Sequence, residues 1–526
     1  MSSARYYACD EAPKTAAELI ELLRYDDRVK VAGVDIDGVL RGKVMAKEKF
    51  LSAAEEGFGF CSVVFGWDLH DQTYGVHTSI SNAENGFGDI MAHIDLSTFR
   101  RIPWENNIAF FLLRFKDRDG QPLSACSRSL LTRVVGGYHA LNLDPLCGAE
   151  FEFYNYQETP QSLAEKQGQG ITPMTPGMFG YSILRPTLQR EFFDKIFSYT
   201  KSIGVPIEGL HTESGPGVYE AALVYAPALE MADRAILFKT TVKQIGLHHG
   251  IIPSFMAKPS ETLPGCSGHL HFSVRDKSTG INAFYDAQAQ PTDADPHRLP
   301  GMSDTMAAFM TGLLIGLPSI LVILAPNINS YKRLVENYWA PVYVNWGQEN
   351  RTASVRVILP PAPSSSSATT HPTPSPNGKA TRLEMRVSGS DINPHLAIAA
   401  CLACGLWGIK HKLTRIPIAS LVNRIDPSAG QIPTVIDTQL SADAVGAEGL
   451  IPVSVQGKVQ ADAPRGVRLS RSLGDAIKAM QEPQSIARQV LGDEFVYHYT
   501  QTRLHECNLW ENAITDWELK RYLEVL

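Results

Sequence analysis

The stretch HTESGPGVYEAAL, residues 211–223, places Glu213 and Glu220 on either side of a Ser-Gly-Pro-Gly turn. Two carboxylates that face one point across a turn repel each other unless a cation lies between them. The turn therefore predicts that this stretch contributes to a cation site.

Three more patterns place charge on one side of a predicted strand. They are Glu-Phe-Glu at 150–152, His-Leu-His at 269–271 and Arg-Leu-Glu-Met-Arg at 382–386. Alternate residues of a strand point to the same face, so each pattern sets polar side chains on one face and an apolar side chain toward a core. A solvated sheet face shows the same alternation, and each pattern taken singly fits that interpretation equally well.

Together these patterns supply a set that is rich in carboxylates and poor in imidazoles. The candidate ligands are Glu150, Glu152, Glu213, Glu220, Glu384 and His269. Hard oxygen donors with one histidine suit Mg²⁺ or Mn²⁺ better than structural zinc. Five carboxylates exceed what one Mg²⁺ retains, so two or more ions are expected.

Arginines are concentrated near the same segments. The stretch 329–357 and the 382–386 pattern carry Arg333, Arg351, Arg356, Arg382 and Arg386. The planar guanidinium matches phosphate and carboxylate oxygens. Metal ligands beside arginines favour phosphoryl transfer. The chain has no P-loop and no kinase-type glycine loop, so the nucleotide must be held in another way.

Composition narrows the class of protein. The chain has 526 residues, 44% of them hydrophobic, and a formal net charge of −7. It can bury a large core, and its charge argues against a nucleic-acid or anionic-membrane binder. Eight scattered cysteines and the lack of a visible signal peptide favour a reducing, cytoplasmic location.

Two apolar segments invite other interpretations. Residues 306–325 are long enough to span a membrane, but Pro318 and Ser319 interrupt them and no basic residues flank them. A buried helix followed by a second apolar segment is predicted instead. Cys401 and Cys404 form a Cys-x-x-Cys motif without a second pair, which favours two small residues on a buried helix over a metal site.

The strand and helix patterns predict an α+β protein in two parts. Residues 1–26 include a short helix, and residues 29–45 are typical of two strands around an Asp-Gly turn. A small domain is expected over 27–120 and one large α+β domain over 121–526. Residues 360–381 are rich in proline, serine and threonine, which predicts a disordered surface loop.

The order and spacing of five segments resemble the signature segments of the glutamine synthetase family, class I-like. The segments are GAEFEF, HTESGPGVYE, GCSGHLHFS, NSYKRLV…AP…WG…NRTASVR and RLEMRVSGSDINPHLA. The resemblance implies an N-terminal β-grasp domain and a catalytic domain whose antiparallel sheet forms an active-site barrel surrounded by helices. It also implies a ring-shaped homo-oligomer, often two stacked hexamers, with active sites between subunits.

The resemblance further implies roles for single residues, with ATP and two or three Mg²⁺ or Mn²⁺ ions in each site. One ion would be held by Glu152, Glu213 and Glu220, and another by Glu150, His269 and Glu384. Nucleotide contacts would come from Glu208, His271, Ser273, Arg356 and Arg382. Glutamate contacts would come from Gly265, Arg333, Arg351 and Arg386, with Arg351 and Arg356 near the transferred phosphate. In the family, ATP phosphorylates the glutamate γ-carboxylate, and a nitrogen nucleophile then displaces the phosphate.

The chain departs from ammonia-using members in the flap, defined here as residues 335–341. Those members read roughly Val-Pro-Gly-Tyr-Glu-Ala-Pro, and this chain reads Val-Glu-Asn-Tyr-Trp-Ala-Pro, so Trp339 replaces the glutamate that helps bind ammonium. An indole offers no acceptor, but its apolar π face suits an alkyl or aryl amine. Similar replacements occur in the branch that makes γ-glutamyl amides of putrescine and other polyamines, which DIDGVLRGK at 35–43 also resembles.

Two further positions bear on the amine site. The family's N-terminal aspartate matches Asp68 better than Asp71, although a solvated loop carboxylate fits Asp68 as well. Glu336 in the flap is a second candidate base. Pro264 stands where ammonia-using enzymes carry an asparagine that contacts glutamate.

These observations lead to one expected function and two alternatives. The expectation is an ATP-dependent ligase that joins the γ-carboxylate of glutamate to a primary amine larger than ammonia. Its catalytic residues would be Arg351, Arg356, Asp68 and Trp339. The alternatives are a glutamine synthetase that tolerates Trp339, and a non-catalytic family member used in assembly or signalling. Glutamate, an amine and further copies of the chain are the expected partners, with no nucleic acid and no membrane.

Overall fold

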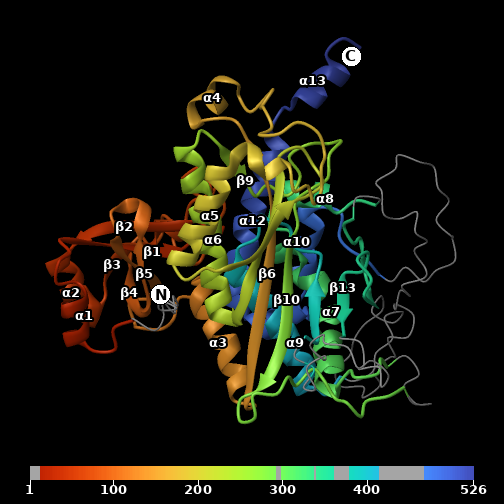
Figure 1. Ribbon diagram of the computed structural model, residues 1–526, viewed down its shortest axis with the longest axis horizontal. Helices are drawn as coiled ribbons and strands as arrows, with labels where there is room; N and C mark the ends of the chain where they lie inside the picture. Colours follow the sequence, from red (N-terminus) through yellow and green to blue (C-terminus); the bar gives the residue numbers. More distant parts are fainter. Residues whose placement is uncertain are drawn as a thin grey trace.

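The computed structural model describes residues 12–291, 298–336, 339–359, 378, 380–413 and 467–525. Its N-terminal part is a five-stranded sheet in the order β2-β1-β5-β4-β3, on the left in Figure 1. The strands are β1 (Arg28–Val34), β2 (Leu40–Ala46), β3 (Phe58–Cys61), β4 (Asp89–Ile102) and β5 (Ile108–Lys116). The helices here are α1 (Ala16–Leu22) and α2 (Lys47–Glu56), with one-turn helices η2 (Ser62–Phe65) and η3 (Pro103–Glu105).

The predicted hairpin around the Asp-Gly turn is confirmed. β1 and β2 pair antiparallel from Arg28 opposite Ala46 to Val34 opposite Leu40. Gly38 has a φ of +79°, a conformation that favours glycine. β1 also pairs with β5 in parallel, and α2 lies in the chain between β2 and β3. This arrangement agrees with a grasp-type sheet, while the domain boundaries at 26/27 and 120/121 stay predictions.

The large part is built around an eight-stranded sheet. Its path is β12-β13-β14-β10-β6-β8-β7, and β9 pairs with β6 beside that path. The strands are β6 (Leu143–Tyr156), β7 (Ile207–Thr212), β8 (Val218–Pro227), β9 (Ile252–Ser254), β10 (Gly268–Asp276), β12 (Trp346–Gln348), β13 (Val355–Ile358) and β14 (Arg382–Met385). Every pairing is antiparallel except β12 with β13, which is parallel. The sheet curls, so the predicted antiparallel active-site sheet is confirmed apart from that edge pair.

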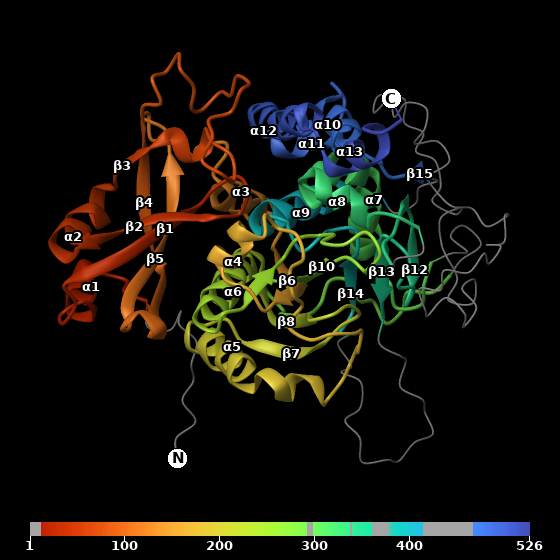
Figure 2. The same ribbon diagram turned by 90° about the horizontal axis from the view of Figure 1, so that it is seen from above.

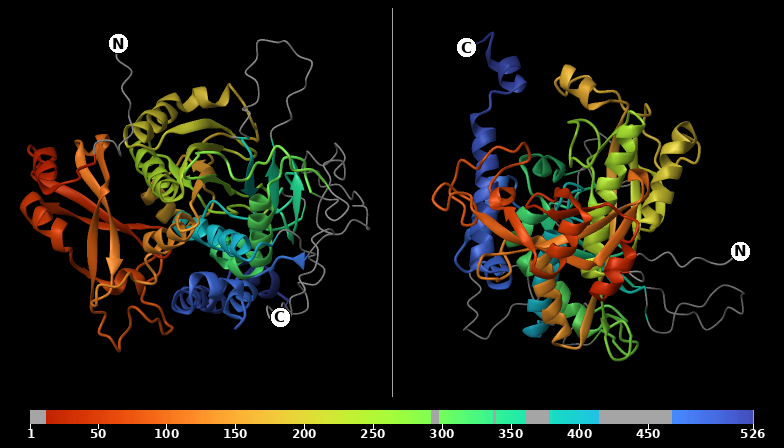
Figure 3. Two further views of the ribbon diagram at one scale, coloured as in Figure 1. Left: turned by 90° about the horizontal axis from the view of Figure 1, so that it is seen from below. Right: turned by 90° about the vertical axis from the view of Figure 1, so that its left-hand side faces the viewer.

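Helices lie around the outer side of the curled sheet, as Figure 2 shows from above. They are α3 (Ser127–His139), α4 (Pro160–Glu165), α5 (Arg190–Ser202), α6 (Ala228–His248), α7 (Asp304–Leu324), α8 (Ile328–Arg333), α9 (Pro394–Lys410), α10 (Leu473–Gln481), α11 (Ile486–Leu491), α12 (Asp493–Asn512) and α13 (Asp516–Tyr522), with the short η4 (Arg185–Gln189). A separate two-stranded sheet joins β11 (Tyr343–Val344) to β15 (Val467–Arg468). Figure 3 shows α13 standing away from the body at the C-terminal end.

The apolar stretch 306–325 forms one helix, α7, which corrects the prediction of a break. α7 runs through Pro318 without interruption. Among the described residues it is the one helix long and apolar enough to cross a membrane, yet 94% of its most apolar stretch is buried. Packing against α9 explains its continuity, since a buried helix gains more from contacts than one proline costs. α9 carries Cys401 and Cys404, which are buried free thiols as predicted.

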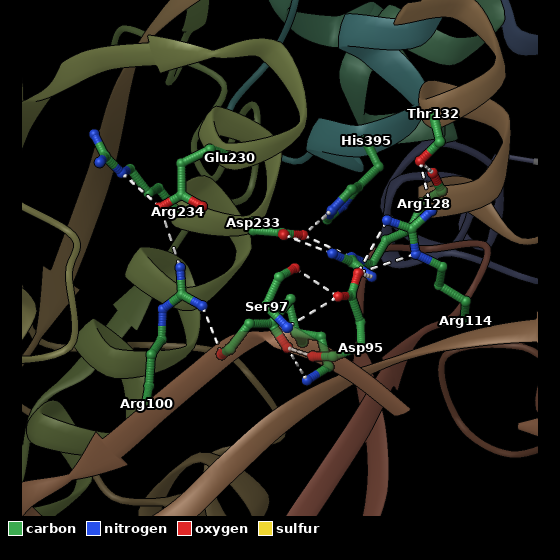
Figure 4. A network of polar contacts seen from close by, with 12 residues as sticks. Asp95, Ser97, Arg100, Arg114, Arg128, Thr132, Glu230, Asp233, Arg234 and His395 are labelled. Carbon is green, nitrogen blue, oxygen red and sulfur yellow. Dashed lines mark hydrogen bonds and ion pairs between the residues drawn. The ribbon is translucent and has the colours of Figure 1, made fainter. Parts of the chain in front are cut away.

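A buried network of charges joins the N-terminal sheet to the large part (Figure 4). Arg128 on α3 donates to both oxygens of Asp233 on α6, each at 2.8 Å, and contacts Asp95 on β4 at 3.1 Å. Nε2 of His395 on α9 lies 2.8 Å from Asp233 Oδ1. Arg114 on β5 also donates to Asp95. Five elements are therefore held in one arrangement.

The predicted loop 360–381 lies almost wholly outside the described residues.

Candidate active site

The predicted metal ligands face one another because of strand register. Glu150 on β6 is opposite His269 on β10, and Glu152 on β6 is opposite Glu220 on β8. On the far side of β10, His271 is opposite Glu384 on β14. The i, i+2 patterns therefore lie on adjacent strands with their polar faces on the same side of the sheet, as the sequence predicted.

The first group of carboxylates is Glu152, Glu213 and Glu220. Burial and the charge of Glu220 raise the pKa of Glu152 to about 8. Burial and Glu220 also raise the pKa of Glu213. The backbone N–H of Ser267 donates to Glu152 Oε2 at 2.6 Å, which fixes the direction of that carboxylate. Three acids held this closely resist ionisation together, and a divalent cation relieves that repulsion.

The second group contains Glu150, Glu384 and two histidines. His269 Nδ1 lies 3.7 Å from Glu150 Oε2 and 3.5 Å from Glu384 Oε1. Ligand atoms of Glu150, His271 and Glu384 also lie within 4.8 Å of one another, so the geometry brings in His271 as well as the predicted His269. Although burial opposes it, the pKa of Glu150 is held well below its usual range by the two histidines that face its carboxylate.

The two histidines differ in the protons they carry. Arg382 Nε donates to His271 Nδ1 at 3.3 Å. An arginine is always a donor, so Nδ1 of His271 accepts and its hydrogen sits on Nε2, facing Glu150 Oε1 at 3.1 Å. His271 therefore acts as a donor in this arrangement. His269 instead presents Nδ1 to the carboxylates of Glu150 and Glu384, at the longer distances given above.

Arginines lie along one side of the second group, in contact with Glu384. Arg356 Nη1 contacts Glu384 Oε2 at 2.9 Å, and Arg386 pairs with Glu384 Oε1. Arg386 Nε also donates to the carbonyl of Arg351 at 2.9 Å. Positive charge from Arg386 and His269 lowers the pKa of Glu384 to about 2 despite its burial. The predicted residues Arg351, Arg356 and Arg386 are thus brought together beside the acids.

Arg333 is built into the wall of the site. It is 5% exposed, and its guanidinium donates to the carbonyls of Val387 at 2.8 Å and Arg386 at 3.1 Å. A Cβ on Gly265 would lie 2.9 Å from Arg333 Cγ. Gly265 therefore allows the arginine to approach this closely, and the two predicted glutamate contacts are neighbours.

A cavity of about 620 Å³ opens beside the second group. Four predicted nucleotide residues line it together with Glu150: Glu208, His271, Ser273 and Arg382. Tyr225 on β8 also lines the cavity and is 66% exposed, a residue that the sequence patterns did not single out. The predicted nucleotide contact Arg356 is not among its lining residues.

An aromatic pair covers the first group. The rings of Tyr181 and His211 stack with centroids 4.3 Å apart, and Gly180 approaches Glu213. His211 Nε2 lies 3.7 Å from Glu220 Oε1, and the interaction with that carboxylate raises the pKa of His211 to about 9. Sequence reasoning gave His211 no role, although it lies opposite Glu220 in the β7–β8 register.

Asp68 and Trp339 are two predicted catalytic residues. In a single chain, neither of them lies in the cluster of acids and arginines described above. Asp68 lines a second cavity of about 700 Å³ between the N-terminal part and α6 and α12, and its Oδ2 lies 3.3 Å from His505 Nε2. Trp339 is half-buried, with a φ of +62°. The alternative base Glu336 is exposed and pairs with Arg468 at 3.0 Å.

Comparisons with known proteins identify the family of this chain. The model of the glutamine synthetase catalytic domain matches residues 124–420 and 452–522. Type-1 glutamine synthetase 2 of Dictyostelium discoideum is 42% identical over 95% of this chain and 84% of its own length. Glutamate–isopropylamine ligase of a Pseudomonas species is 31% identical over 95% of both chains. Gamma-glutamylethanolamide synthetase GlnA4 of Streptomyces coelicolor is 29% identical over 95% of this chain and 93% of its own.

Solved structures show the same fold. A GmaS/ADP complex covers 96% of this chain and 99% of its own, with a TM-score of 0.71 and 23% identity. The family model matches more than half of the chain, and two of these relatives are more than 30% identical over most of both chains, so this chain belongs to the glutamine synthetase family, whose members are ATP-dependent carbon–nitrogen ligases.

Proposed function

We propose that this enzyme joins the γ-carboxylate of glutamate to a primary amine larger than ammonia, through a γ-glutamyl phosphate. The observation that carries the proposal is the combination of an intact acid and arginine set with Trp339 in the flap. A machinery for phosphoryl transfer is retained, whereas the flap acceptor for ammonium is absent. Relatives that act on isopropylamine and ethanolamine support an amine larger than ammonia as the substrate.

The residues fit the divalent ions that family members use with ATP. Glu152, Glu213 and Glu220 would hold one ion, and Glu150, His269 and Glu384 another, as Mg²⁺ or Mn²⁺. Burial and the charge of Glu220 raise the pKa values of Glu152 and Glu213, and a cation between these carboxylates would offset that cost. Such ions would neutralise charge on the ATP phosphates when bound.

The chain's own groups then account for each step. Glu208, His271, Ser273 and Arg382 line the cavity proposed for the nucleotide. Arg333 and Gly265 would position glutamate, while Arg351 and Arg356 would stabilise charge on the transferred phosphoryl group. The amine would attack beneath the flap, where Asp68 of a neighbouring subunit would accept its proton.

We also propose a cytoplasmic homo-oligomer, a dodecamer of stacked hexamers. An exposed apolar strip supports association: Met178, Phe179, Ile183, Leu184 and Leu188 are 53, 45, 94, 74 and 62% exposed. A strip of this size is unusual on the free surface of a monomer. Tyr181 lies within the same strip, so a neighbouring subunit seated there would lie close to the active site.

A second candidate is ammonia-dependent glutamine synthesis, because a relative of that name is 42% identical. Trp339→Glu separates the two candidates. The amine proposal expects this change to raise kcat/KM for ammonium and to lower it for the organic amine, since a carboxylate restores the missing acceptor. Ammonium use that is already efficient in the wild type, with no gain on substitution, would favour the second candidate. Trp339→Phe is the matched control, because it keeps an apolar ring and adds no acceptor.

A further inference from the structure

A distant part of the chain fastens the end of the flap. β11, directly after the flap, pairs antiparallel with β15, so that Tyr343 lies opposite Arg468 and Val344 opposite Val467. The N–H of Leu469 donates to the carbonyl of Val342 at 2.9 Å, and the Leu469 side chain is buried. The chain therefore passes from the flap directly into β11, and pairing with β15 holds β11 in place.

The side chain of Arg468 contacts both ends of the flap. Its Nη1 donates to Glu336 Oε1 at 3.0 Å and to the Tyr343 hydroxyl at 3.3 Å. The guanidinium also lies 5.5 Å from the centroid of the Tyr343 ring. Tyr343 in turn donates to Glu336 Oε1 at 3.4 Å. One guanidinium thus ties a residue at the start of the flap to a residue just beyond its end.

The same strand is tied to the arginines of the active site. Ser354 Oγ donates to the Tyr343 carbonyl at 2.5 Å, and the Ser354 N–H donates to Asn345 Oδ1 at 2.9 Å. The Arg386 N–H donates to the Ser354 carbonyl at 2.9 Å. β11 therefore lies between β15 on one side and the segment of Ser354 on the other, and Ser354 in turn accepts a hydrogen bond from Arg386.

We propose that Arg468 is a positioning residue that sets where the flap, and with it Trp339, sits over the amine. This inference rests on the proposed function. It also assigns Glu336 as the anchor of the flap rather than as a replacement base, since its carboxylate already accepts from Arg468 and Tyr343. Side chains of Arg468 and Glu336 are 40% and 50% exposed. An ion pair this exposed adds little to global stability, so its effect is expected on amine binding.

The test compares Arg468→Ala and Arg468→Lys with Arg471→Ala, an exposed arginine three residues farther along. Arg468→Ala is expected to raise KM for the amine about two- to fivefold, with KM for glutamate and ATP unchanged. Arg468→Lys should recover part of the loss, because an ammonium can reach Glu336 but cannot bridge to Tyr343. Arg471→Ala should behave as wild type. The double variant Arg468→Ala/Glu336→Gln should be no worse than Arg468→Ala alone, as expected for groups that act together.

Amide hydrogen exchange supplies a readout that does not depend on activity. Peptides covering residues 334–344 should exchange faster in Arg468→Ala than in Arg471→Ala. An unchanged amine KM together with unchanged exchange would overturn the proposal, and so would equal rises in KM for all three substrates. If the wild type shows no amine-dependent turnover, the proposed function fails, and the exchange result alone decides whether Arg468 holds the flap.

Discussion

Glu152 on β6 and Glu220 on β8 lie directly opposite each other in the register of the sheet. Like charges in this position destabilise a sheet, and burial adds to the cost, which is why the pKa of Glu152 rises to about 8. A fold built only for stability has no reason to keep this pair. The pair is explained if it forms part of a cation site, because a bound cation relieves the repulsion between the two carboxylates.

Removing one charge of this pair should stabilise the metal-free protein. Glu220→Gln is expected to raise the free energy of unfolding in chelator by up to about 1 kcal/mol, while keeping the side-chain size. The same change should reduce the extra stability that Mg²⁺ gives the wild type. Urea unfolding with chelator and with Mg²⁺ measures both effects. Glu55→Gln, at an exposed position on α2, is the matched control and should change neither value. A Glu220→Gln variant that Mg²⁺ stabilises as much as wild type would contradict the ligand role.

Acid should weaken the junction between the N-terminal sheet and the large part. Burial lowers the pKa of His395 below its usual value of 6.5, although Asp233 acts in the opposite direction. The folded state therefore binds fewer protons here than the unfolded state, and the stability that neutral His395 contributes is lost as pH falls through and below that value. Arg128, Arg114 and Asp233 face the imidazole, and the charge of Arg128 holds the pKa of Asp233 well below its usual range despite burial.

The His395→Gln variant tests this sign. Glutamine keeps a donor for Asp233 and removes the titration, so the free energy of unfolding should fall less steeply between about pH 7 and about pH 5 than in wild type. Urea unfolding at several pH values gives the two slopes. His139→Gln, on an exposed histidine of α3, should leave the wild-type slope unchanged. Identical slopes for wild type and His395→Gln would show that other groups govern the acid response.

The crossing of α7 and α9 should tolerate no added methyl group. A Cβ on Gly312 would lie 2.3 Å from the carbonyl oxygen of Cys404 and 2.7 Å from Gly408 Cα. Gly312→Ala should therefore cost about 1–3 kcal/mol of unfolding free energy. Gly136→Ala on α3 is the matched control. A Cβ there meets nothing within 4 Å, so the change should stabilise the protein by about 0.5–1 kcal/mol. Thermal and urea unfolding of both variants give the comparison, and equal effects would contradict the close crossing.

The sequence predicted most of the site because short patterns encode strand faces. The i, i+2 spacing of Glu150 and Glu152, and of His269 and His271, placed these side chains on one face before any fold was known. The pairing of β6 with β10 and β8 then follows from long-range packing, which one sequence does not reveal. His211 was missed for that reason, since only the β7–β8 register sets it opposite Glu220.

Helix α7 shows where local rules fall short. Pro318 predicts a break, yet the structure continues the helix because most of its residues from Met306 to Leu324 are buried, and the helix packs against α9. The link from Arg468 to Glu336 was equally hidden, because the two residues are 132 positions apart. Local patterns specified the chemistry of this protein, and tertiary contacts specified how the flap is held.

The most direct test of the central claim is phosphate release from ATP with glutamate and Mg²⁺ across a panel of amines that includes ammonium. We expect release that depends on an organic amine, is weak with ammonium, and vanishes in Glu150→Ala protein. Release that is fastest with ammonium would contradict an amine larger than ammonia as the substrate. Protein that binds ATP but releases no phosphate with any amine would contradict the ligase activity itself, or show that the carboxyl substrate is not glutamate.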